Sequence, residues 1–120
     1  MVLHVKSPAI VKAAGNKPKI IEEFFGQVNS RTDEVSIARM KSPAGWVEPG
    51  QTPEFAEYTL VLKGTVRVAT RKETLDVHSG EGILVQKGEW VQYSTPGIVG
   101  AEYVSVCLPA FSPSTVHRDS

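Results

Sequence analysis

The sequence predicts an all-β domain, either a sandwich or a barrel. Short runs of β-branched and aromatic residues alternate with turn signals along the whole chain, which is the pattern of an all-β fold. No long amphipathic helix stands out, and the only helix candidate is the short segment around Pro8–Ala14. The 120 residues correspond to one ordinary domain, large enough to bury a core without metal or disulfide bonds.

The first strands are expected over Lys19–Val28 and Val35–Lys41. The polar segment Asn29–Glu34 separates them as a turn. Ser42–Gly45 ends the second strand, because proline cannot donate a hydrogen bond to a sheet and glycine permits a turn.

Further strands are expected toward the C-terminus, separated by turns at Arg71–Glu73 and Pro96–Gly97. They are Tyr58–Leu62, Thr65–Thr70, Thr74–Val77, Ile83–Val85, Trp90–Ser94 and Ala101–Leu108. The pattern around Gly64 predicts a hairpin between the first two of these strands.

We expect one domain with three parts. Residues 1–34 form an arm of strands that packs on the barrel or on a partner subunit. Residues 35–111 form the barrel, and residues 112–120 form a C-terminal tail.

Charge and cysteine content restrict the function classes. The 13 basic and 13 acidic residues cancel, which removes the electrostatic argument for nucleic acid or an anionic membrane as a partner. A single cysteine, Cys107, excludes an intramolecular disulfide. The N-terminal residues have no apolar run like that of a signal peptide. We therefore expect a cytoplasmic protein without a nucleic-acid or membrane partner.

Two glycine-framed blocks carry a more specific pattern. In Gly45–Gly64, five residues separate the first glycine from Gln51. One residue then precedes Pro53, three more precede Glu57, and six more precede the final glycine. In Gly80–Thr95, the glycine is followed after five residues by Gln86, and then by Gly88, Val91 and Thr95. These spacings resemble the two motifs of the cupin family. The resemblance implies a double-stranded β-helix, a jelly-roll barrel with Gly45, Gly64, Gly80 and Gly88 at turns.

In the cupin family, two histidines and a glutamate of the first motif and a histidine of the second bind one divalent metal ion. The corresponding positions here are Gln51, Pro53, Glu57 and Val91, so one carboxylate remains. We therefore expect no metal and no other cofactor. The alternative is a metal site with substitute oxygen ligands, taken from Glu48, Gln51, Glu54 and Glu57.

Residues two apart on a strand share a face, and the resemblance implies that the motif faces line the barrel interior. The residues expected to line one cavity and bind substrate are Gln51, Glu57, Tyr93, Val61 and Val91. Glu57 is also the candidate catalytic residue. In apolar surroundings its pKa would rise, making it a proton donor or acceptor; otherwise it is a hydrated carboxylate without a role.

Arg39 is a further candidate for substrate binding. If Val35 and Ile37 face inward, Arg39 does too, and it must then pair with Glu57, Glu48 or a ligand carboxylate. If the opposite phase faces inward, Arg39 is an ordinary solvated side chain.

These features predict a metal-free binder of a small polar or carboxylate-bearing molecule. The alternatives are an enzyme and a structural dimer with a filled cavity. The enzyme would be a metal-free isomerase, epimerase or lyase using Glu57 with Tyr93 or Arg39, or a metalloenzyme with the substitute ligands.

A homodimer is expected from the run Ile20–Phe25, which carries large apolar residues on both faces. A second subunit would cover it by edge-strand addition across a two-fold axis. The alternative is that the run packs on its own barrel beneath Pro109–Pro113.

Overall fold

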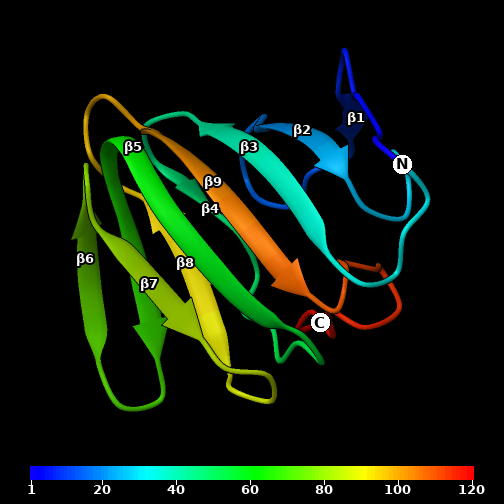
Figure 1. Ribbon diagram of the computed structural model, residues 1–120. Helices are drawn as coiled ribbons and strands as arrows, with labels where there is room; N and C mark the ends of the chain where they lie inside the picture. Colours follow the sequence, from blue (N-terminus) through cyan, green and yellow to red (C-terminus); the bar gives the residue numbers. More distant parts are fainter.

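The computed structural model describes residues 1–120 and contains nine strands and no helix. The strands are β1 (Ala9–Val11), β2 (Ile20–Phe25), β3 (Ser36–Ser42), β4 (Trp46–Val47), β5 (Ala56–Thr70), β6 (Thr74–His78), β7 (Gly82–Val85), β8 (Val91–Thr95) and β9 (Ala101–Leu108) (Figure 1). The prediction of an all-β fold is confirmed. No helix that could cross a membrane is found.

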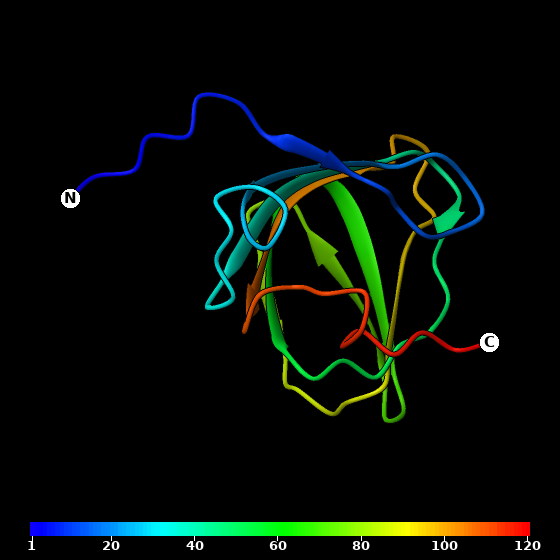
Figure 2. The same ribbon diagram turned by 90° about the vertical axis from the view of Figure 1, so that its right-hand side faces the viewer.

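The strands form two antiparallel sheets that share β5. The larger sheet has the order β1-β2-β3-β9-β5-β7, and the smaller one joins β6, β5, β8 and β4. Figure 2 shows the sheets curled around a common interior, with the first residues of the chain extending away from the barrel. We call them the large and the small sheet.

The long strand β5 connects the two sheets and corrects one prediction. No hairpin forms at Gly64, because β5 runs without interruption from Ala56 to Thr70. Its first part pairs with β7 and β9 and its last part with β6 and β8. Gly64 has a φ of 74°, and an added Cβ would lie 2.0 Å from the carbonyl oxygen of Gly100. Glycine is thus required where the strand passes between sheets.

The N-terminal region differs from the prediction in two respects. The helix candidate Pro8–Ala14 is wrong, since its central residues form β1. The expected edge-strand addition through Ile20–Phe25 is also wrong, because β2 pairs with β1 on one side and β3 on the other. This run therefore has no free edge, and the arm strands belong to the chain's own large sheet.

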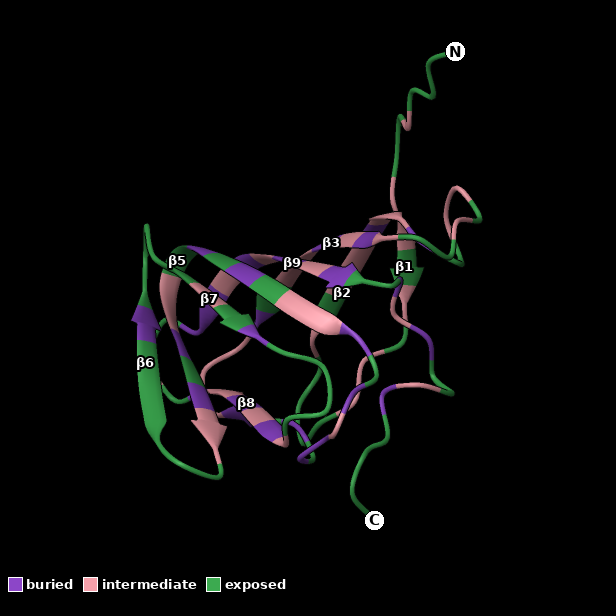
Figure 3. Cartoon of the chain, turned by 60° about the horizontal axis from the view of Figure 1, so that its bottom comes forward, coloured by how far each residue is buried: buried purple, intermediate pink, exposed green.

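The apolar core lies between the two sheets and forms one cluster of ten buried side chains. The small sheet contributes Trp46, Val66, Val68, Val77, Val91 and Tyr93, and the large sheet contributes Val61, Val85, Ala101 and Tyr103. In Figure 3 buried and exposed segments alternate along the strands, as expected when successive residues face opposite sides of a sheet. Beside this core, the interior also contains a polar cavity, which shares Tyr93 and Tyr103 with it.

A candidate functional site in the barrel cavity

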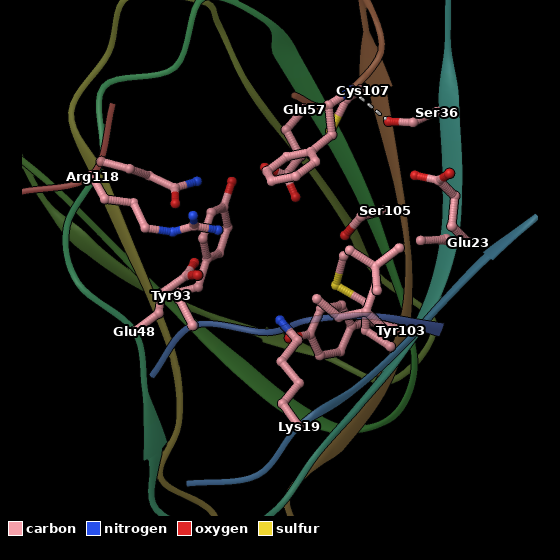
Figure 4. A pocket seen from close by; sticks show the side chains of 17 residues that line it. Lys19, Glu23, Ser36, Glu48, Glu57, Tyr93, Tyr103, Ser105, Cys107 and Arg118 are labelled. Carbon is pink, nitrogen blue, oxygen red and sulfur yellow. Dashed lines mark hydrogen bonds between the residues drawn. The ribbon is translucent and has the colours of Figure 1, made fainter. Parts of the chain in front are cut away.

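A small cavity lies inside the barrel, against the inner face of the large sheet. Its volume is about 60 Å³, which holds a few water molecules but is several-fold below the ~300–1,000 Å³ of typical ligand pockets. Its polar lining residues are Lys19, Glu23, Ser36, Glu48, Gln51, Glu57, Tyr93, Tyr103, Ser105, Cys107 and Arg118 (Figure 4).

Two carboxylates contribute acidic groups to the cavity. Glu48 follows β4 and is buried, and this burial raises its pKa from the usual value of 4.5 to about 7, although the charge of Lys19 opposes the shift. Glu57 projects from β5, and burial likewise raises its pKa, again opposed by Lys19. A carboxyl group with a pKa near neutrality can donate or accept a proton.

Two cations come from segments far apart in the sequence. Lys19 precedes β2, and its Nζ lies 4.0 Å from the centre of the Trp46 ring and 5.2 Å from that of Tyr103. Arg118 lies close to Glu48 (Figure 4). The positive charge of Arg118 lowers the pKa of Glu48, which opposes part of the rise caused by burial. The cavity thus combines two acidic side chains with two basic ones.

Arg118 is held at the cavity by a C-terminal strap, residues 115–119. Backbone hydrogen bonds join this strap to the segment 50–54: Asp119 donates to Gly50, Thr52 to His117, and Glu54 to Thr115. The side chains of His117 and Glu54 also pair on the outside of this contact. The strap therefore closes one end of the barrel.

Two buried polar atoms in the cavity have no hydrogen-bond partner within the protein, the Tyr93 hydroxyl and Gln51 Oε1. Burial raises the pKa of Tyr93, and the neighbouring carboxylates Glu57 and Glu48 raise it further. The phenol is therefore neutral at ordinary pH. Since buried polar groups are nearly always paired, both atoms are suited to bind water or a polar group in the cavity.

The structure brings three of the expected site residues together. Gln51, Glu57 and Tyr93 all line the cavity. Val61 and Val91 do not, because both are fully buried in the apolar core; their predicted position in the lining is wrong. The binding and catalytic roles of all these residues stay predictions.

Arg39 lies outside the cavity, so its inward placement is wrong. The small residues Ser36 and Ala38 occupy the buried inner face of β3, which leaves Arg39 on the outer face. There its Nε donates a hydrogen bond to Glu22 Oε1 at 2.8 Å, and this contact lowers the pKa of Glu22.

Several lining residues were not recognised from the sequence. Tyr103, Ser105 and Cys107 alternate along β9, and this period of two was a usable signal in the predicted strand Ala101–Leu108. Lys19 and Arg118 gave no such signal, because their approach depends on how the arm and the strap fold back over the barrel.

No group of three histidine, cysteine, aspartate or glutamate side chains is placed to hold a metal ion. Of the four substitute ligands considered, Glu54 lies on the surface, paired with His117. The expectation of a metal-free site stays a prediction.

Sequence comparison identifies a relative with a defined activity. The chain is 41% identical over 102 residues to a protein of Myxococcus xanthus named Endoribonuclease YbeY. The match covers 85% of this chain but only 35% of that protein, so the chain spans about a third of its relative's length. No model of a protein family matches the sequence.

This relationship contradicts the function expected from the sequence. A relative named as a ribonuclease points away from a metal-free binder of a small polar molecule. The cavity volume of about 60 Å³ gives a physical reason, since it leaves no room for a ligand of ordinary size.

Structural comparison identifies the fold. Polyketide cyclase RemF from Streptomyces resistomycificus matches with a TM-score of 0.76 and 17% identity, over 100% of this chain and 85% of that one. A single-residue variant of oxalate decarboxylase from Bacillus subtilis matches with a TM-score of 0.78 and 16% identity, over 97% of this chain and 31% of that one. The cupin domain of Cnp3 from Schizosaccharomyces pombe matches with a TM-score of 0.67 and 13% identity, over 76% of this chain and 61% of that one. The chain has the double-stranded β-helix fold of the cupins.

Proposed function

We propose that this chain is a cupin-fold domain that acts in RNA cleavage, as the partner of an RNA-cleaving domain. The observation that carries the proposal is the 41% identity to part of an endoribonuclease. This level of identity over 85% of the chain supports a shared role as well as a shared fold.

The division of the Myxococcus protein supports a partner role. Because the 102 matched residues make up 35% of it, about 190 of its residues lie outside the match, which is enough for a further domain of ordinary size. In this proposal the region outside the match cleaves the RNA, and the cupin-fold domain is its partner in that reaction.

A second candidate is that the chain itself cleaves RNA. It is favoured by the acid–base cavity, where Glu48 has a pKa of about 7 and Arg118 supplies a positive charge. Glu57 or Glu48 would take the proton of a ribose 2′-hydroxyl as its oxygen attacks the adjacent phosphorus. The bond to the 5′-oxygen then breaks, that oxygen takes up a proton from the other carboxyl group, and a 2′,3′-cyclic phosphate remains. The small cavity volume makes this candidate the weaker one.

A domain exchange tests the proposal. The matched segment of the Myxococcus protein would be replaced by this chain, and cleavage of a fluorescent single-stranded RNA would be followed for the chimera, the intact relative and this chain alone. We expect the chimera to retain at least about a tenth of the relative's rate and the isolated chain to show none. A folded chimera without activity, in contrast to an active relative, would contradict the shared role.

The two candidates are separated by one variant of the same chimera. Replacing Glu48→Gln and Glu57→Gln together removes both acid–base groups and keeps their size. If the partner domain cleaves the RNA, the variant chimera stays active. If the cavity cleaves it, both the variant chimera and the corresponding variant of the isolated chain lose activity.

This proposal replaces the expectation that the protein has no nucleic-acid partner, since it makes RNA the substrate of the assembly. A cytoplasmic location and a homodimer are kept as proposals. The first fits a role in RNA cleavage, and the second depends on a surface of the large sheet.

A further inference from the structure

An open groove lies on the outside of the barrel, at the end of the large sheet where β3 ends and β9 begins. Its volume is about 680 Å³, more than ten times that of the cavity. A row of residues in register crosses four strands there, Ile20 on β2, Lys41 on β3, Glu102 on β9 and Lys63 on β5. The loop that joins β8 to β9 lies beside the end of β3 (Figure 1) and contributes Val99. We call this groove, defined by these five residues, the lysine groove.

The two lysines of the groove have no acidic partner within the chain. Lys41 and Lys63 are both in register with Glu102, but none of the chain's ion pairs includes either of them. Both side chains are exposed. One carboxylate between two ammonium groups leaves the groove with an excess of positive charge, and such a surface favours an acidic partner.

The apolar part of the groove comes mainly from a loop with a fixed shape. Ile98 and Val99, in the loop between β8 and β9, are 94% and 79% exposed, and Ile20 in the same groove is 50% exposed. The loop is tightly packed at its base, where an added Cβ on Gly100 would lie 2.2 Å from the carbonyl oxygen of Ser42. Clustered apolar side chains in water mark interaction sites, and a loop with a fixed shape loses little conformational entropy when it binds.

We propose that the lysine groove binds a segment of the RNA-cleaving partner domain that carries acidic and apolar side chains, an inference that rests on the proposed function. The carboxylates of the segment pair with Lys41 and Lys63, and an apolar side chain packs between Ile20 and Val99. About 190 residues of the Myxococcus protein lie outside the match, and a domain of this size can supply such a segment. The contact involves neither the cavity nor the strap.

A protein segment fits the groove better than RNA does. Glu102 lies between the two lysines in register and would repel a phosphate group. None of the nine residues that line the groove is aromatic, whereas proteins that bind single-stranded RNA commonly stack its bases on aromatic rings. The apolar side chains of Ile20 and Val99 gain instead from burial against a protein.

The test is the rate at which each lysine is acetylated by a soluble reagent, measured by mass spectrometry without RNA. The isolated chain is compared, at the same concentration, with the chimera in which this chain replaces the matched segment of the Myxococcus protein. Lys41 and Lys63 should react at least about tenfold more slowly in the chimera, because a carboxylate beside each ammonium group disfavours the neutral, reactive amine. Lys72, exposed in the turn between β5 and β6, is the control and should react equally in both.

Variants of the loop show whether the groove causes this protection. Val99→Asp in the chimera removes an apolar contact and places a negative charge against the acidic segment, so Lys41 and Lys63 should again react as in the isolated chain. Ile98→Asp, beside it in the loop, should act in the same direction and decides if the first variant unfolds, as judged by circular dichroism. Leu75→Asp is the matched control, because Leu75 is exposed on β6, outside the groove, and it should leave the protection unchanged.

Equal acetylation of Lys41 and Lys63 in the isolated chain and in a folded chimera would overturn the proposal, and so would protection that survives Val99→Asp. Protection of the isolated chain by single-stranded RNA would assign the groove to RNA and overturn it too. The acetylation rates do not depend on cleavage. A chimera with protected lysines but no activity would therefore contradict only the proposed function, and an active chimera with reactive lysines would contradict only the docking site.

Discussion

The two sheets of the barrel both contribute to the apolar core, but they differ in their other side chains. The small sheet buries Val66, Val68 and Val91 on its inner face and presents Arg67 and Asp76 to water, where they form a salt bridge. The large sheet surrounds a cavity with carboxylates and hydroxyls and presents leucines to the outside. The large sheet thus combines its share of the core with a polar cavity on its inner side and exposed leucines on its outer side.

The largest effect is expected from the apolar core, where the small sheet contributes Trp46. Trp46 is fully buried, and its indole nitrogen donates a hydrogen bond to the carbonyl oxygen of Ala14. Replacing Trp46→Ala should lower the free energy of unfolding by about 3–5 kcal/mol, measured by urea denaturation. Trp90→Ala is the control, because Trp90 is half-buried at the barrel end. Equal losses in the two variants would contradict the place of Trp46 in the core.

The next effect is a pH dependence that belongs to the cavity. The pKa of Glu48 is about 7 in the folded protein, against an ordinary value of 4.5. Between these pH values the folded state binds more protons than the unfolded state, so stability falls as the pH rises through this range. The difference corresponds to up to about 3 kcal/mol.

Glu48→Gln should remove this contribution. Urea denaturation at pH 5 and pH 8 should show a larger loss of stability at high pH for the wild type than for the variant. The remaining pH dependence of the variant comes from Glu57, whose pKa is shifted in the same direction. Identical pH profiles for the two proteins would show that folding does not raise the pKa of Glu48.

The smallest effect concerns the polar side chains that line the cavity on the large sheet. Ser105 contacts Thr59 through a long hydroxyl–hydroxyl distance of 3.4 Å. Ser105→Ala should therefore change the free energy of unfolding by about 1 kcal/mol or less. Val68→Ala, at a comparable inner position of the small sheet, should cost about 2 kcal/mol, since it removes two buried methyl groups. A larger loss for Ser105→Ala would reverse the proposed contrast between the sheets.

Much of the fold could be predicted from local sequence patterns. The turns at Gly45, Gly80 and Gly88 follow from the motif spacing, and all three residues have positive φ. Gly64 was misassigned because a positive φ suits both a hairpin and a strand that bends between sheets. β1 was missed because three residues are too few to show a strand period.

The candidate site was predicted only in part, for a related reason. Strand alternation is a local signal, and it correctly grouped Gln51, Glu57 and Tyr93. It could not choose the phase of β3, where both faces carry apolar residues, and so Arg39 was left open. Lys19 and Arg118 reach the cavity from the arm and the strap, and their position depends on tertiary contacts that no local pattern encodes.

The contrast between the sheets is tested most directly by the accessibility of their leucine methyl groups. A soluble paramagnetic agent broadens the NMR signals of methyl groups that face the solvent. We expect the methyl signals of Leu60 to be protected, because in the proposed homodimer a second subunit covers the outer face of the large sheet. The signals of Leu75, which is 41% exposed against 49% for Leu60 in the single chain, should be strongly broadened. Equal broadening of Leu60 and Leu75 would show that the outer face of the large sheet is open to water, and would contradict a second subunit on that face.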